Sequence, residues 1–277
     1  MSEQAKPNQK RVLIWAVTRS LSTVLVRALS QIPDTQVIFE YYMAAGWNTV
    51  PDALVNESSQ EKSLVNMEPD VTFQSVKAMY EQDYPGKSLI LGKEMPNMLG
   101  RRMDVIPHGY THIFLIRYPA KTIPSLNKVY GFATSEMKRA HLLGPNQFEM
   151  MDELYEFVTK TRPHETAVVL DAEDLMAQPA KSLQLLCEAT GLPFSQSLLH
   201  WDPIKDLPSN WSMPKSLWAY SSTVGYFKNA FESTCFRAKT GDSSSKSQEQ
   251  DDQDLCRFIQ DAQPYYESMY KRRLIAQ

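Results

Sequence analysis

A short run of hydroxyl and guanidinium side chains follows the first apolar segment of the chain. Residues 18–23 read Thr-Arg-Ser-Leu-Ser-Thr, and they lie between an apolar stretch and a segment with helical apolar spacing. Backbone N–H groups at a helix start are unpaired, and the helix dipole favours an anion there. Arg19 adds a permanent charge, and Ser20, Ser22 and Thr23 add hydroxyl donors. The turn predicts a phosphate or sulfate site, with an ordinary N-cap by Ser20 or Ser22 as the alternative.

The elements that must position this turn follow an alternating pattern. Short apolar runs predict buried strands at residues 11–17, 36–39, 88–92, 111–116 and 166–170. Helical spacing or helix-ending residues predict helices at residues 24–32, 71–80, 119–130, 148–161, 179–190 and 255–274. Such alternation predicts an α/β fold with three layers, in which helices cover both faces of a central, mostly parallel sheet.

The nucleoside-triphosphate P-loop is the competing phosphate motif. It requires G-x-x-x-x-G-K-[ST] between a strand and a helix. Gly86, Lys87 and Ser88 supply the end of that motif, but Glu81 stands where its first glycine belongs. The tripeptide also precedes its predicted strand instead of following it. Both observations argue against an ATPase or kinase.

Composition limits the class of protein. The chain has 277 residues, 43% of them hydrophobic, with a formal net charge of −3, so we expect one domain and no nucleic-acid partner. Cys187, Cys235 and Cys256 have no metal-ligand spacing and indicate a reducing compartment. Residues 1–10 are polar and without a signal-peptide pattern, and residues 240–254 are polar throughout. We therefore expect a flexible N-terminus, a mobile loop at 240–254, no membrane span and a cytoplasmic location.

The turn at residues 18–23 resembles the phosphosulfate loop P-[KR]-S-G-[ST]-T of sulfotransferases that use 3′-phosphoadenosine 5′-phosphosulfate (PAPS). Four positions match the loop: Arg19, Ser20, Ser22 and Thr23. Thr18 replaces the proline, and Leu21 replaces a glycine that eases close backbone approach. The resemblance implies a P-loop-like nucleotide-binding core in which this whole turn, including Leu21, binds PAPS.

A second segment resembles the same family. Arg117 ends the predicted strand 111–116, and Ser125 follows eight positions later. The family places an arginine and a serine at this spacing, and both hold the 3′-phosphate of the nucleotide. The resemblance assigns that role to these two residues. The alternative is a strand-end arginine that caps a neighbouring helix, with a solvated serine.

A third segment, residues 220–231, resembles the loop R-K-G-x-x-G-D-W-K-N-x-F that covers the nucleotide. The matching positions are Gly225, Lys228, Asn229 and Phe231. The basic Arg-Lys-Gly head of that loop is replaced here by Tyr220, Ser221 and Ser222. The resemblance therefore implies weaker electrostatic binding of the 3′-phosphate. It leaves Ser221, Ser222, Thr223 and the backbone near Gly225 as hydrogen-bond donors. Ala172 stands where a tyrosine often stacks on adenine, so that contact is not expected.

The resemblance also implies a reaction, in which an acceptor attacks the sulfur of PAPS while cations neutralise the leaving phosphate. Arg19 and Lys93 would supply these charges, and no metal is expected. Cytosolic relatives use a histidine base in K-T-H-x-P, which this chain lacks. Protein-tyrosine sulfotransferases use a glutamate whose offset from the loop arginine matches Glu40, which is therefore our first choice of base. Glu94 is the second choice, and His141 stays open.

The acceptor is the least defined part of the prediction. Aromatic residues near Glu40 and before residue 220 predict either a small-molecule pocket or core packing: Tyr41, Tyr42, Trp47, Trp211 and Trp218. We expect a small molecule, such as a natural product, that is sulfated on oxygen or nitrogen. The oligomeric state is not indicated. The alternative function is a catalytically silent nucleotide- or anion-binding module, which the substitutions at Leu21, Ala172 and the Arg-Lys head favour.

Overall fold

The computed structural model describes residues 9–49, 68–129, 146–237 and 253–275. The candidate base His141 lies outside these ranges, and so do residues 1–8 of the expected flexible N-terminus. The expected mobile loop lies outside them as well, except for its last two residues, 253 and 254, which begin the final helix.

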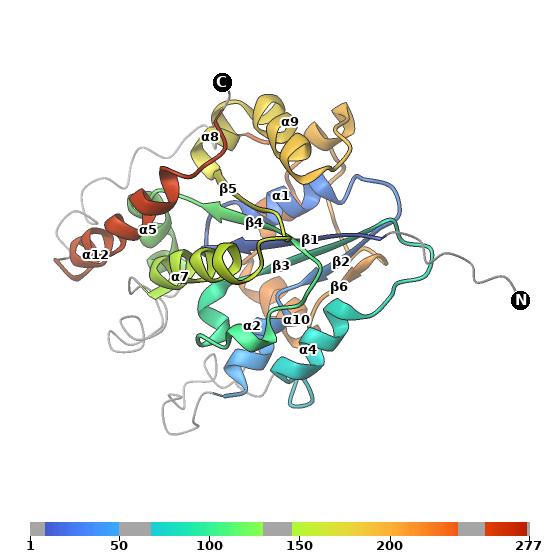
Figure 1. Ribbon diagram of the computed structural model, residues 1–277, viewed down its shortest axis with the longest axis horizontal. Helices are drawn as coiled ribbons and strands as arrows, with labels where there is room; N and C mark the ends of the chain where they lie inside the picture. Colours follow the sequence, from blue (N-terminus) through green and yellow to red (C-terminus); the bar gives the residue numbers. More distant parts are fainter. Residues whose placement is uncertain (1–8, 50–67, 130–145, 238–252, 276–277) are drawn as a thin grey trace, which may run out of the picture.

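A parallel six-stranded sheet forms the centre of the molecule (Figure 1). Its order is β5-β4-β1-β3-β2-β6, and every pairing is parallel. The strands are β1 (Lys10–Ala16), β2 (Thr35–Phe39), β3 (Leu89–Glu94), β4 (Thr111–Ile116), β5 (Ala167–Asp171) and β6 (Trp211–Ser212). Because β1, β3 and β2 are neighbours, the loops that follow them meet at the carboxyl edge of the sheet.

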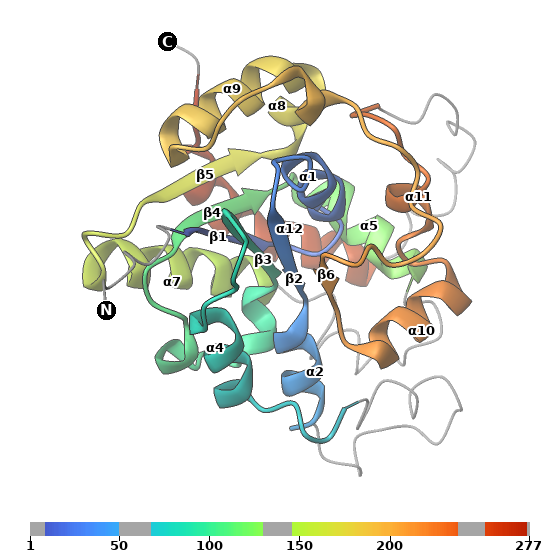
Figure 2. The ribbon, with the colours of Figure 1, turned by 90° about the vertical axis from the view of Figure 1, so that its right-hand side faces the viewer.

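Helices cover both faces of this sheet, which confirms the predicted three-layer α/β fold (Figure 2). One face packs against α1 (Ser22–Leu29), α8 (Ala172–Ala177), α9 (Pro179–Thr190), α10 (Lys215–Val224) and α11 (Lys228–Phe231). The other packs against α4 (Phe73–Glu81), α5 (Pro119–Val129), α7 (Asn146–Thr161) and α12 (Gln253–Tyr270). The short helix α2 (Tyr41–Trp47) follows β2 and contributes side chains to both cores.

The third strand is longer than the sequence predicted. The apolar run ends at Gly92, but β3 continues to Glu94, and Lys93 and Glu94 pair in register with Ile14 and Trp15 of β1. Lys93 is therefore part of the strand and not a residue just past it. Successive strand residues point to opposite faces, so Lys93 and Glu94 enter different environments.

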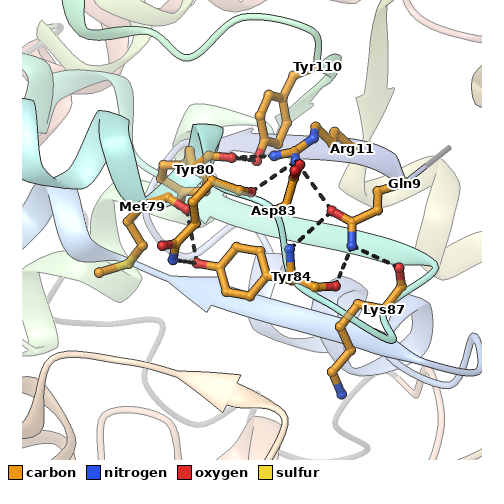
Figure 3. A network of polar contacts seen from close by, with 9 residues as sticks. Gln9, Arg11, Met79, Tyr80, Asp83, Tyr84, Lys87 and Tyr110 are labelled. Carbon is orange, nitrogen blue, oxygen red and sulfur yellow. Dashed lines mark hydrogen bonds and ion pairs between the residues drawn. The ribbon is translucent and has the colours of Figure 1, made fainter. Parts of the chain in front are cut away.

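The amino-terminal edge of the sheet carries a polar network that fixes how the chain enters β1 (Figure 3). The Arg11 guanidinium donates to the carbonyl oxygens of Tyr80 at 2.6 Å and Gln82 at 2.9 Å. The Gln9 side chain bonds the backbone of Tyr84 on both its donor and acceptor sides. These contacts tie β1 to the connection between α4 and β3, so this edge has a structural role.

Candidate active site

The turn between β1 and α1 has strained backbone. Arg19 and Leu21 adopt left-handed φ angles of 66° and 69°, and Leu21 is the N-cap of α1 without a side-chain cap bond. Such conformations cost free energy for residues other than glycine and cluster at functional sites. Ser20 between them is fully buried, and its hydroxyl has no hydrogen-bond partner among the described residues. A buried, unpaired hydroxyl at a helix start is a ready donor to an anion.

Arg19 brings the three sequence segments together. Its Nε donates to Ser125 Oγ at 3.1 Å, its Nη1 reaches the Tyr226 carbonyl oxygen at 3.4 Å, and its guanidinium lies 5.4 Å from the Tyr226 ring centroid. Arg117 Nη1 donates to the Arg19 carbonyl oxygen at 3.0 Å. Arg19, Arg117, Ser125 and Tyr226 thus join the segments 18–23, 117–125 and 220–231 in one cluster, although these segments lie far apart in the sequence.

Arg117 also has an acidic partner. Its Nε donates to Glu173 of α8 at 2.9 Å, and Lys121 pairs with the second oxygen of the same carboxylate. Burial opposes ionisation of Glu173, but the hydrogen bonds from Lys121 and Arg117 outweigh it and lower the pKa of this carboxyl group. The prediction did not include Lys121, which follows Arg117 by about one helical turn. A phosphate at this position would compete with Glu173 for both cations.

The segment predicted as a covering loop is mostly helical. It forms the end of α10, the left-handed C-cap Gly225 with φ 68°, and α11. Ser222 is exposed and donates to the Trp218 carbonyl oxygen at 2.8 Å. Ser221 is buried, and its hydroxyl has no partner among the described residues. The structure therefore presents Ser221 as the available hydroxyl instead of Ser222, while the Thr223 side chain lies outside the described part.

Glu40 and Lys93 form a buried ion pair at the carboxyl edge. Glu40 follows β2 with a left-handed φ of 57°, and its N–H donates to the Lys93 carbonyl oxygen at 2.9 Å. The Lys93 ammonium group contacts the Glu40 carboxylate directly, and both side chains are 3% exposed. The two residues predicted to act together are therefore adjacent, on the edge that also carries the turn after β1.

Glu94 has a different environment from its neighbour. Its carboxylate accepts the backbone N–H groups of Tyr41 at 2.9 Å and Tyr42 at 3.2 Å, and the Tyr80 hydroxyl at 2.7 Å. These bonds cap the start of α2. Complete burial raises the pKa of Glu94 to about 8. Its bonds are those of a structural cap, so the geometry does not support Glu94 as the base.

His112 also has a structural role. Trp15 Nε1 donates to His112 Nδ1 at 3.0 Å, and His112 Nε2 lies 2.9 Å from Glu165. Because Nδ1 accepts a hydrogen bond, it carries no proton, so the ring is neutral and Nε2 donates to the Glu165 carboxylate. Burial lowers the pKa of His112, although Glu165 opposes that shift. Its strand position lies toward the amino edge, away from the candidate site.

Most of the aromatic candidates for an acceptor pocket belong to the core. Tyr42 is fully buried and stacks on Phe73 and Tyr80. Trp211 stacks on Phe39, with 5.6 Å between the ring centroids. Trp47 is buried as well, and Trp218 packs against the core from a partly buried position. Core packing was the alternative interpretation of these residues, and the structure favours it for the three buried ones.

One buried polar residue near the turn carried no sequence signal. Gln147, in the first turn of α7, accepts the Thr18 N–H on its Oε1 at 2.9 Å. Its Nε2 has no partner among the described residues.

Within the described ranges, no cluster of acidic, histidine or cysteine side chains could hold a metal ion. No helix in those ranges has both the length and the apolar character needed to cross a membrane.

Comparisons with known proteins assign the family. A family model described as a sulfotransferase domain matches residues 10–273. In Arabidopsis thaliana, branched-chain-amino-acid aminotransferase-like protein 2 is 26% identical over 194 residues, which are 68% of this chain and 31% of that protein. The aminotransferase-like protein 1 is 26% identical over 231 residues, covering 80% and 36%. The chain therefore spans about a third of the length of these two curated relatives.

A solved structure agrees with this assignment at the level of the fold. The sulfotransferase domain of the olefin synthase from Synechococcus PCC 7002 superposes with a TM-score of 0.50 at 13% identity, over 99% of this chain and 100% of that domain. The family match extends from β1 to the end of the last helix and includes every candidate site residue. The chain belongs to the sulfotransferase family.

Proposed function

We propose that this protein transfers the sulfuryl group of PAPS to a hydroxyl or amino group of a small molecule. The observation that carries the proposal is the convergence of three separate segments on the Arg19 side chain, which contacts Ser125 and Tyr226. Two buried hydroxyls in these segments, on Ser20 and Ser221, have no partner among the described residues. Such groups are unfavourable unless a ligand pairs with them.

The nucleotide would bind across this cluster. The start of α1 and the Ser20 hydroxyl would hold the 5′-phosphosulfate. Arg117 and Ser125 would hold the 3′-phosphate, with Lys121 and Ser221 as additional donors. In this arrangement Arg117 exchanges its single hydrogen bond to the Glu173 carboxylate for hydrogen bonds to a phosphate, which can accept two from one guanidinium group. The 3′-phosphate then distinguishes PAPS from ATP.

The proposed reaction is an in-line displacement at sulfur. The acceptor oxygen forms a bond to sulfur while the bond between sulfur and the bridging oxygen of the 5′-phosphate breaks. The electron pair of that bond stays on the phosphate oxygen, which leaves as part of 3′-phosphoadenosine 5′-phosphate (PAP). The acceptor proton goes to the Glu40 carboxylate. Arg19 and the N–H groups of the turn stabilise the charge on the leaving phosphate.

Lys93 has two effects in this mechanism. Its ammonium group contacts the Glu40 carboxylate and fixes its position at the end of β2. It also places a positive charge at the carboxyl edge of the sheet, where the sulfuryl group passes between its two oxygen partners. A buried charge that has both an ionic partner and a ring contact, here with Phe39 at 5.2 Å, is held firmly in place.

A transfer assay tests the proposal. PAPS labelled in its sulfuryl group is incubated with the protein and a panel of small alcohols, phenols and amines, and labelled product and PAP are measured together. We expect equal amounts of both. Glu40→Gln keeps size and hydrogen bonding, and we expect it to lower turnover on a hydroxyl acceptor roughly 10²-fold, with nucleotide affinity nearly unchanged.

The matched control is Glu153→Gln, because Glu153 lies on α7 in an exposed ion pair with Arg101. We expect that variant to turn over like the wild type. Bound nucleotide without transfer to any acceptor would favour the silent binding module instead. Near-normal turnover of Glu40→Gln on a hydroxyl acceptor would remove Glu40 from the role of base.

A further inference from the structure

The Gln147 carboxamide is buried but only half satisfied. The side chain is 3% exposed, its Oε1 accepts the Thr18 N–H at 2.9 Å, and its Nε2 has no hydrogen-bond partner in the described ranges. A backbone N–H can only donate, so the oxygen must face Thr18 and the NH₂ group must face elsewhere. A buried amide donor without a partner is costly, and native proteins rarely keep one without a reason.

The contacts of Thr18 place the Gln147 carboxamide beside the turn after β1. Thr18 is the first residue of the phosphate-binding turn, and its hydroxyl contacts the sulfur of Met95 at 3.5 Å. Met95 directly follows β3, two residues after Lys93. The carboxamide carbon of Gln147 joins Oε1 and Nε2, so Nε2 lies next to the same turn. Thr18 itself lies at the carboxyl edge, between the turn and the end of β3.

We infer that Gln147 Nε2 donates a hydrogen bond to a sulfuryl oxygen of the bound donor. This inference rests on the proposed function. The sulfuryl group must sit beyond the 5′-phosphate held by the turn, and before the acceptor that faces Glu40. Its oxygens carry negative charge and need donors in a site that excludes water. A neutral amide can supply one without adding another cation beside Lys93.

The Thr18 contact makes Gln147 a rigid donor. The hydrogen bond from the Thr18 N–H to Oε1 restricts rotation of the planar carboxamide, and the burial of the side chain restricts it further. A donor held in place before the ligand arrives loses little entropy on binding. Any movement of the turn would also move the amide, so the two groups would bind the donor together.

Comparing PAPS with PAP isolates this contact, because only PAPS carries the sulfuryl group. Gln147→Glu keeps the acceptor for the Thr18 N–H and removes the donor. We expect it to weaken PAPS binding about tenfold or more relative to PAP, as measured by calorimetric titration of both nucleotides. Gln82→Glu is the control, since Gln82 is exposed at the opposite edge of the sheet and adds the same charge.

A second measurement needs no substitution that alters the fold. In a protein labelled with ¹⁵N, the side-chain amide resonances of Gln147 should shift with PAPS and stay nearly unchanged with PAP. Equal losses of PAPS and PAP affinity in Gln147→Glu, or equal resonance shifts with both, would overturn the inference while leaving the proposed function intact. If the wild type binds neither nucleotide, the proposed function fails and the inference fails with it.

Discussion

Leu21 has an unfavourable left-handed backbone conformation, and replacing it tests how much free energy that conformation costs. It adopts φ 69° and ψ 18° at the N-cap of α1, where the sulfotransferase loop has glycine. The left-handed conformation costs a residue with a Cβ about 1–2 kcal/mol. Glycine avoids this cost but loses about 0.4–1 kcal/mol relative to alanine through the freedom of its unfolded chain. Leu21→Gly should therefore be more stable than Leu21→Ala, by about 0.8 kcal/mol at the midpoints of these two ranges.

Comparison of these two variants cancels the loss of the leucine side chain, which packs partly against the core. The assay is urea unfolding monitored by circular dichroism. The free energies of unfolding of the two variants are compared on condition that their denaturant m-values are equal. The reference is Ala180→Gly, on the exposed surface of α9, where glycine should be less stable than alanine by up to about 1 kcal/mol. If alanine were also the more stable choice at position 21, the assigned backbone strain would be refuted.

Three further predictions concern binding, stability and pH. Arg117→Ala should weaken PAP binding roughly tenfold to 100-fold in calorimetry, since charge-assisted hydrogen bonds are lost; an unchanged affinity would place the 3′-phosphate elsewhere. Arg27→Met should lower the free energy of unfolding in urea by about 2–4 kcal/mol, because the buried guanidinium donates to the carbonyl oxygens of Ala230, Phe231 and Ser233. Burial lowers the pKa of His112, so below about pH 6.5 the unfolded chain binds a proton at this residue more readily than the folded chain. The free energy of unfolding should therefore fall as the pH drops below that value. An NMR titration should find His112 still neutral at that pH, and full protonation there would contradict its buried hydrogen bonds.

The parts of the fold that local patterns specify were predicted well. The strand at 111–116 and the helix at 179–190 have the predicted bounds, and Gly191 ends that helix with φ 66°. Continuous apolar runs and a glycine stop carry their information within a few residues. The resemblance also implied that residues 18–23, 117–125 and 220–231 bind one nucleotide, and Arg19 contacts Ser125 and Tyr226 of the other two segments.

The parts that depend on distant contacts were missed. The start of α2 is capped by Glu94, whose bonds to Tyr41 and Tyr42 join residues more than fifty positions apart. The two-residue strand β6 exists only through its pairing with β2. The residues near α2 and β6 contain no local pattern that indicates Glu94 or β2 as their partners. Reasoning from a single sequence therefore could not place these two elements.

The same distinction applies to the candidate site. The resemblance named Arg19, Arg117 and Ser125, and the structure brings them together. It left Ser221 and Ser222 as equivalent donors, whereas the helix exposes Ser222, whose hydroxyl bonds the Trp218 carbonyl oxygen, and buries Ser221. Gln147 was missed because its importance comes only from Thr18, 129 residues away.

We propose above all that this site binds a nucleotide with a 3′-phosphate. Calorimetric titration of the wild-type protein with PAP, and with ATP as the competitor, tests it most directly. We predict one PAP per chain and far weaker binding of ATP, with PAP at 100 times its Kd stabilising the fold by about 2.7 kcal/mol. Equal affinity for the two nucleotides, or no binding of either, would contradict the account.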